Sequence, residues 1–353
     1  MGRLSLNLIF LLSLAPADWS TLDRYQRTMT RLEFDFLLTN VYDTAGTLAG
    51  DLMYTSNSVT ISGYTLQFAA EAPRPSPHRI RRIVLDPGHI GGAWARMEER
   101  FFVRGNDRPV QEAALNLKVA HLLKQQLETA GVTVLLTKEK FDPVTEKRPE
   151  DFREQAEREV PVSQDEANRA DAVRKRQEML FYRSAEIAAR SQLVNERLKP
   201  DLTICIHFNA VEWNDCHELV DDNRLVVFVH GNILPEELTE PDRRLRLLQK
   251  MLERSHEVEQ PIAESIAAGL ARATGLSPAV QPRNLAANRL YDGPVIYLEP
   301  YYMNNRTVYE RLQAGDYYGE KMIAGKSRKS IFREYADGVM DGLRPFLAPR
   351  LNQ

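Results

Sequence analysis

The sequence predicts an α/β fold: an open, mostly parallel, twisted sheet with helices on both faces, preceded by a small N-terminal accessory module. Three observations carry this prediction. Apolar runs at 83–85, 202–206 and 294–298 each lead into a polar residue, a helical pattern covers 112–127, and a further apolar run covers 132–137. Apolar runs of this length that alternate with helical patterns are typical of buried parallel strands joined by helical crossovers.

The first strand, helix and strand form one predicted βαβ unit. The strand 83–85 leads into a Pro-Gly turn that ends at His89, and the helix begins at Glu112 and ends before Gly131. His89 therefore lies at the carboxyl end of a strand, which is where open α/β sheets build their sites. A glutamate in the first turn of a helix is, by itself, explained by the helix dipole.

The other two strands end in the same way. The run 202–206 is followed by His207, and the run 294–298 is followed by Glu299. A histidine after an apolar run is, taken alone, more often hydrogen-bonded to the backbone than bound to a metal. Two histidines and a glutamate at three strand ends together indicate a hydrolytic metal site.

At these residues the chain resembles the zinc-dependent N-acetylmuramoyl-L-alanine amidases of amidase family 3, which cut peptide stems from peptidoglycan. The resemblance covers roughly residues 80–346, and its motifs follow the family's order. The matching segments are Asp86-Pro87-Gly88-His89 with Gly91-Gly92, Glu112 with Asn116-Leu117, Arg190 with Asn195, Ile206-His207-Phe208-Asn209-Ala210, and Glu299 with Asn304-Asn305.

The resemblance implies a zinc ion held by His89, Glu112 and His207, with Glu299 as the general base. It implies peptidoglycan or muropeptides as the substrate and the amide between N-acetylmuramic acid and L-alanine as the bond that is cut. Weaker candidates are residues that support the site or contact the substrate: Asp86 to fix the His89 ring, Arg190 to pair a carboxylate and orient its helix, and Asn195 and Asn209 beside them.

Three departures from the family pattern bear on this interpretation. Ile90 is inserted before the glycine pair, Pro-Tyr at 300–301 replaces the family's Gly-Phe, and the helix glutamate comes 23 positions after the motif histidine. The long connection leaves Glu98 and Glu99 as rival ligands. Glu112 is preferred because only Glu112 carries the Asn-Leu continuation. We expect zinc binding to survive these changes and the fine specificity to differ.

Residues 1–17 have the pattern of a signal peptide. A basic head at Arg3, an apolar run over 4–14 and a small-residue ending predict cleavage after Ala17. The run is shorter than the roughly 20 residues of a membrane span, so we expect no stable span after cleavage and a location in the periplasm or cell envelope. A buried N-terminal helix and a poorly cleaved anchor are the alternatives. Loss of Arg3 changes the formal charge from −3 to −4, and this mild acidity gives no sign of nucleic-acid binding.

The accessory module is expected over residues 18–70. Its apolar spacing predicts one or two helices within 19–40, and alternating residues predict short strands over 59–62 and 64–68. A linker stiffened by three prolines is expected over 71–80.

The catalytic domain is expected over residues 81–350, with charged insertions near 139–178 and 211–259. Either insertion is surface elaboration or a wall beside the site. The second contains a strand that ends at His230, the one further histidine placed to approach the site.

Two other interpretations remain open on the sequence. The chain could be another zinc amidohydrolase or carboxypeptidase of the same fold, or a wall-binding protein that has lost its chemistry; retention of every ligand type and of Glu299 argues against the latter. The two cysteines, Cys205 and Cys216, are too few for a disulfide framework and lack the C-x-x-C spacing of zinc ligands. An activator protein is left open as a partner.

Overall fold

The computed structural model describes residues 17–71, 79–162, 165–211 and 218–348. The expected signal peptide (apart from Ala17), most of the expected linker, and Cys216 lie outside these residues. Packing divides the chain into two compact units, one combining the N-terminal residues with Gly231–Arg254 and the other formed by Ser76–His230 with Ser255–Gln353. No helix among the described residues is long and apolar enough to cross a membrane.

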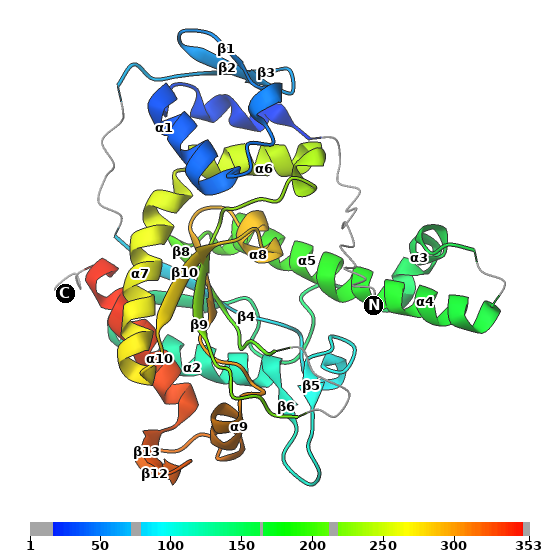
Figure 1. Cartoon of the computed structure of the whole chain (residues 1–353), viewed down its shortest axis with the longest axis vertical. Helices are drawn as coiled ribbons and strands as arrows, with labels where there is room; N and C mark the ends of the chain where they lie inside the picture. Colours follow the sequence, from blue (N-terminus) through cyan, green and yellow to red (C-terminus); the bar gives the residue numbers. More distant parts are fainter. Residues whose placement is uncertain (1–16, 72–78, 163–164, 212–217, 349–353) are drawn as a thin grey trace. The chain divides into compact units, whose positions relative to one another are not determined.

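A six-stranded sheet forms the centre of the larger unit, and Figure 1 labels its strands β4, β8, β9 and β10. The strand order is β10-β9-β11-β8-β4-β7. All neighbouring strands are parallel except β9 and β11, which are antiparallel. The open, mostly parallel sheet is therefore confirmed, with one reversed pairing. The strands are β4 (Arg82–Pro87), β7 (Thr133–Leu136), β8 (Leu202–Ile206), β9 (Leu225–Val229), β10 (Pro278–Pro282) and β11 (Val295–Glu299).

Helices cover both faces of this sheet, as predicted. Side chains along a strand alternate between its faces, so Ile83 and Leu85 of β4 pack into the core beneath α2, α7 and α10, whereas Val84 joins Val194 and Tyr291 on the other face, beside α5 and α8. The covering helices are α2 (Glu112–Thr129), α7 (Ser255–Thr274) and α10 (Ile331–Leu343) on the first face, and α5 (Glu186–Gln192) and α8 (Ala286–Leu290) on the second.

The remaining elements of the larger unit are short or lie outside the main layers. The first expected insertion is helical and largely exposed, as its charge predicted, and it runs through a continuous helical segment into α5. These elements are α3 (Arg153–Glu159), α4 (Glu166–Met179), α9 (Arg306–Gln313), and the strand pairs β5 (Phe101–Phe102) with β6 (Val110–Gln111) and β12 (Glu320–Ile323) with β13 (Lys326–Lys329).

The smaller unit contains the expected helix and hairpin, together with a segment that was expected in an insertion of the catalytic domain. Helix α6 packs its apolar side chains, among them Leu245, Leu248 and Met251, into one core with Leu22 and Phe34. The stretch 211–259 is thus no single insertion, because β9 is an internal strand of the main sheet and α6 belongs to the smaller unit. The elements here are α1 (Arg31–Leu37), β1 (Met53–Tyr54), β2 (Ser58–Ile61), β3 (Tyr64–Gln67) and α6 (Pro241–Leu252).

Candidate metal centre

The turn after β4 brings the two motif histidines together. Gly88 packs so closely on the second histidine that a Cβ atom there would lie 1.9 Å from His207 Cε1. His89 takes a left-handed backbone conformation, with φ of 63°, which turns its ring back toward the end of β8. Asn116 of α2 holds the turn by donating a hydrogen bond to the Gly88 carbonyl at 3.1 Å.

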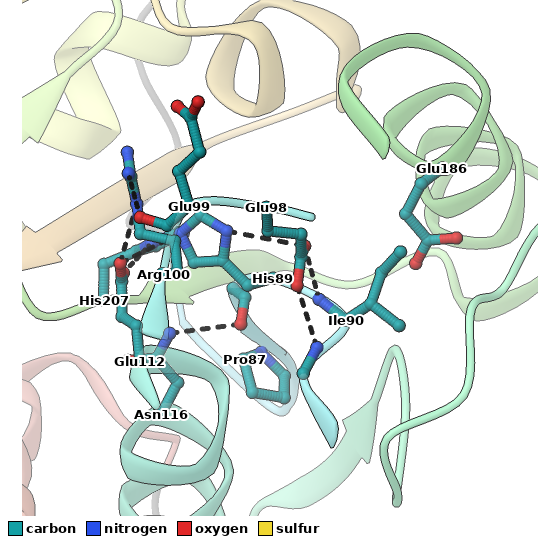
Figure 2. A network of polar contacts seen from close by, with 12 residues as sticks. Pro87, His89, Ile90, Glu98, Glu99, Arg100, Glu112, Asn116, Glu186 and His207 are labelled. Atoms are coloured by element: carbon teal, nitrogen blue, oxygen red, sulfur yellow. Dashed lines mark hydrogen bonds and ion pairs between the residues drawn. The ribbon is translucent and has the colours of Figure 1, made fainter. Parts of the chain in front are cut away.

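Three side chains, from the start of α2 and from the turns that follow β4 and β8, form a compact cluster (Figure 2). The Glu112 carboxylate bridges the two imidazoles, with Oε2 at 3.1 Å from His89 Nε2 and Oε1 at 2.8 Å from His207 Nδ1. One potential ligand atom from each residue lies within 4.8 Å of the other two. Glu112 and His207 are buried, and His89 is partly buried. The structure therefore brings together all three residues that the sequence analysis assigned to a metal.

The charges of this cluster favour an ionised carboxylate. Burial alone would raise the pKa of Glu112, but the two histidines reverse this and hold it well below its usual range. Burial works against protonation of His89, yet the carboxylates of Glu112 and Glu98 raise the pKa of His89 to about 9. Burial lowers the pKa of His207 despite its bond to Glu112. An anionic carboxylate beside two imidazoles is a donor set suited to a divalent cation.

The rival ligands Glu98 and Glu99 lie outside the cluster. Glu98 is buried and accepts hydrogen bonds from the backbone N–H groups of Ile90 at 2.8 Å and Gly91 at 2.9 Å (Figure 2). Its Oε1 lies 3.6 Å from His89 Nδ1, whereas Glu99 is exposed. Glu98 thus holds the loop that contains the inserted isoleucine and lies beside the His89 ring on the side away from Glu112.

Arg190 of α5 holds the same turn through hydrogen bonds to its backbone. Its guanidinium donates to the carbonyl of Pro87 at 3.1 Å, to the carbonyl of His89 at 2.9 Å, and to Asp86 Oδ1 at 3.0 Å. Its Nε donates to Glu186 Oε1 at 2.8 Å. The expected carboxylate pairing is therefore present, and it is coupled directly to the backbone of a candidate ligand.

Asp86 differs from its expected role beside the His89 ring. Its carboxylate accepts hydrogen bonds from Thr137 at 2.5 Å and from Tyr291 at 2.7 Å, in addition to Arg190. Burial raises the pKa of Asp86, but Arg190 and the hydrogen bonds from Thr137 and Tyr291 together hold it below its ordinary value. The position next to the imidazole is taken by Glu98, because the Asp86 carboxylate is held by Thr137, Tyr291 and Arg190 instead.

Asn195 lies farther from the cluster, where it fixes the approach to β11. Its amide donates to the Leu290 carbonyl at 2.9 Å and accepts from the Asp292 N–H at 2.8 Å. These bonds order the chain just before the strand that carries Glu299.

Glu299 lies beside the cluster and faces the same pocket. The pocket has a volume of about 540 Å³ and is lined by His89, Glu112, His207, Asn209 and Glu299 among others. Asn209 donates a hydrogen bond to Glu299 Oε2 at 2.6 Å. Burial, together with the negative charge of Glu112, raises the pKa of Glu299 to about 7. A carboxyl group poised near neutral pH is suited to accept and return a proton.

Sequence reasoning missed two residues at this site. Arg100 Nε lies 3.1 Å from Glu112 Oε2, and no local pattern marks this arginine in the loop before β5. The ring of Tyr297 stacks on His207 with a centroid distance of 4.2 Å. The position of Tyr297 could have been predicted, because it lies two residues before Glu299 in the same strand and its side chain therefore faces the same side of the sheet.

His230 does not approach the centre. It is fully buried, and its backbone N–H donates to Glu259 at 3.1 Å. Because β9 runs antiparallel to β11, the carboxyl end of β9 lies at the opposite edge of the sheet from Glu299. The expectation that His230 could reach the site assumed a parallel strand and is wrong.

The family of this chain follows from a comparison with sequence models of known protein families. A sequence model described as N-acetylmuramoyl-L-alanine amidase matches residues 83–331. Comparison with curated protein sequences gave no match.

Similar solved structures include three from bacteria. Cwp6 from Clostridium difficile is 14% identical with a TM-score of 0.43, over 76% of this chain and 29% of that chain. The CwlD amidase from Clostridioides difficile, in complex with the GerS lipoprotein, is 14% identical with a TM-score of 0.44, over 75% of this chain and 98% of that one. The catalytic domain of CwlV, an N-acetylmuramoyl-L-alanine amidase from Bacillus (Paenibacillus) polymyxa, is 15% identical with a TM-score of 0.42, over 76% and 98%. Since the matched residues 83–331 make up well over half of the sequence, the chain belongs to the N-acetylmuramoyl-L-alanine amidases of amidase family 3.

Proposed function

We propose that this protein uses zinc to hydrolyse the amide between N-acetylmuramic acid and L-alanine in peptidoglycan, in remodelling or lysis of the cell wall. The observation that carries the proposal is the buried cluster of His89, Glu112 and His207, with ligand atoms within 4.8 Å of one another, in a pocket that Glu299 also lines. Two imidazoles and one carboxylate are a known ligand set of catalytic zinc sites, in which a fourth position is left for water or substrate.

The chain's own residues divide the remaining work. When bound, zinc supplies Lewis acidity that polarises the scissile carbonyl and makes a water molecule more acidic. Glu299 takes the proton from the attacking water and returns it to the leaving amine. The Asn209 hydrogen bond at 2.6 Å orients the Glu299 carboxylate for both transfers. Arg190 and Glu98 hold the backbone on either side of His89, so that its ring keeps its direction.

Product analysis tests this function. We expect the zinc-loaded protein to release stem peptides that begin with L-alanine from purified peptidoglycan, and mass spectrometry of the soluble fraction would identify them. Release of single carboxyl-terminal amino acids would instead identify a carboxypeptidase. Binding to the wall without any product would identify a protein that has lost its chemistry.

We further propose that residues 1–17 direct export and are removed. The support is the basic head, the apolar run and the small residues up to Ala17, together with a family whose substrate is peptidoglycan. Protein isolated from the native envelope should begin at Asp18 on N-terminal sequencing. Recovery of the chain from the cytoplasm with Met1 intact would contradict export.

The smaller unit is proposed to be an accessory module attached to a catalytic domain over 81–350. The support is its separate apolar core, which includes the side chains of α6. A chain lacking the unit is not a suitable test, because α6 lies within the sequence of the catalytic domain. Exposed side chains such as Leu32 and Phe36 are better targets for substitution, with peptidoglycan binding as the measurement.

A further inference from the structure

A second cleft adjoins the metal pocket on the α5 and α8 side of the sheet. It has a volume of about 580 Å³, and Asn209 lines both this cleft and the metal pocket. Its floor is made by side chains of β9 and β10 that share one face of the sheet, because Val226 pairs with Ala279 and Phe228 with Gln281. Its other lining residues include Asn223, Arg224, Tyr302 and Arg283.

A row of rings connects the metal cluster to the far end of this cleft. Tyr297 stacks on His207 at 4.2 Å between centroids, and Phe228 meets Tyr297 edge-on at 6.3 Å. The guanidinium carbon of Arg283 lies 5.6 Å from the centroid of the Phe228 ring. A row of aromatic rings thus runs from a candidate metal ligand to an arginine.

The charge of Arg283 is available to a ligand. The side chain is exposed, and no carboxylate among the described residues forms an ion pair with it. The other arginine in the cleft differs in this respect, because Arg224 is held by Asp222 with an N···O distance of 3.1 Å. The positive charge of Arg283 also lowers the pKa of Glu299 and so partly offsets the rise caused by burial.

The spacing between Glu299 and Phe228, whose ring lies beneath the Arg283 guanidinium, fits a short extended peptide. In the sheet, Glu299 pairs with Val226, two residues before Phe228. Two strand residues cover roughly 7 Å, and neighbouring strands lie roughly 5 Å apart, so the backbone of Phe228 lies roughly 9 Å from that of Glu299. The Arg283 guanidinium lies beyond this point, 5.6 Å from the centroid of the Phe228 ring. An extended chain covers this span with two to three residues at about 3.4 Å each.

We propose that this cleft binds the peptide side of the substrate and that Arg283 pairs with a carboxylate on the residue that follows L-alanine. The inference rests on the proposed amidase function. The glycan side does not fit the cleft's charge, since the only carboxyl group of N-acetylmuramic acid is consumed in the scissile amide. A stem peptide whose second residue is acidic supplies an anion at the right distance, and an arginine fork binds carboxylates well.

Two soluble substrates that differ only in charge test the proposal. They are N-acetylmuramoyl-L-alanyl-glutamate and its diamide, offered to the zinc-loaded full chain. We expect the wild type to prefer the acid by about ten-fold in kcat/KM, the size of one net charge-assisted hydrogen bond. Arg283→Gln should reduce this ratio to about one, and Arg283→Lys should retain part of it. Arg272→Gln, which removes a positive charge from the end of α7, should keep the wild-type ratio.

The possible outcomes distinguish failure of the cleft assignment from failure of the proposed amidase function. A wild-type ratio near one, or an Arg283→Gln variant that keeps the full preference, would overturn the cleft assignment while leaving the amidase function intact. If the wild type cleaves neither substrate, the amidase function fails. In that event, calorimetry with free L-alanyl-glutamate decides the cleft: weaker binding by Arg283→Gln supports it, and equal binding by both proteins refutes it.

Discussion

The environment of Glu299 predicts that removing its charge stabilises the metal-free protein at alkaline pH. Burial and Glu112 raise the pKa of Glu299 from 4.5 to about 7. A raised carboxyl pKa means that the folded state binds the proton more tightly than the unfolded state does. The stability from this proton is complete below about pH 4.5 and is lost as the pH rises through about 7. Glu299→Gln keeps a hydrogen-bond acceptor for Asn209 but never acquires the charge.

The size of the effect follows from the shift in pKa. A pKa difference of about 2.5, at about 1.4 kcal/mol for each pKa unit, sets an upper limit of about 3.5 kcal/mol. Because Glu299 is partly rather than fully buried, we expect Glu299→Gln to exceed the wild type by about 1–3 kcal/mol at pH 8 and to match it at pH 4.5. Urea unfolding with a chelator present, at both pH values, measures the difference. Equal stabilities at pH 8, or a loss of stability in the variant there, would refute this account of the site.

Four further substitutions test the geometry around the cluster. Glu112→Ala should abolish high-affinity zinc binding, whereas Glu98→Gln should weaken zinc binding by about 10–100-fold, because it loosens the loop beside His89. Competition with a zinc chelator measures both affinities. A larger loss in Glu98→Gln than in Glu112→Ala would identify Glu98 as the ligand. Gly88→Ala should weaken zinc binding at least as much as loss of a ligand does, because the added methyl group would overlap the His207 ring. A variant that binds zinc with wild-type affinity would contradict the close approach of this turn to the ring. Arg190→Leu should lower the free energy of unfolding by about 3–5 kcal/mol, because it leaves buried carboxylates without their partner. Denaturant titration measures this change. A much smaller loss would show that water can replace the guanidinium.

The local features of the site were predictable, because each is written in a short segment. Strand ends at His89, His207 and Glu299 follow from apolar runs that stop at a polar residue. The helix start at Glu112 follows from the helical spacing after it. The carboxyl ends of parallel strands meet at one edge of a sheet, so their proximity was also predictable.

The features that were not predicted depend on contacts that leave no pattern in the sequence. The reversed direction of β9 is set by its antiparallel pairing with β11. As a result, His230 lies at the opposite edge of the sheet from Glu299. The position of α6 is set by the apolar core of another unit. Glu98 looked like a competing ligand because its bonds to backbone N–H groups leave no trace in the sequence. Arg100 was missed for the same reason, since a single arginine in a loop carries no pattern.

The most direct test of the central claim is turnover of muropeptides by Glu299→Gln, compared with the wild type at matched zinc content. We predict that the variant keeps its zinc and its fold and loses about a hundred- to ten-thousand-fold in kcat, the usual effect of removing a positioned acid or base. Near-normal turnover with full zinc occupancy would remove Glu299 from the chemistry and contradict the proposed mechanism.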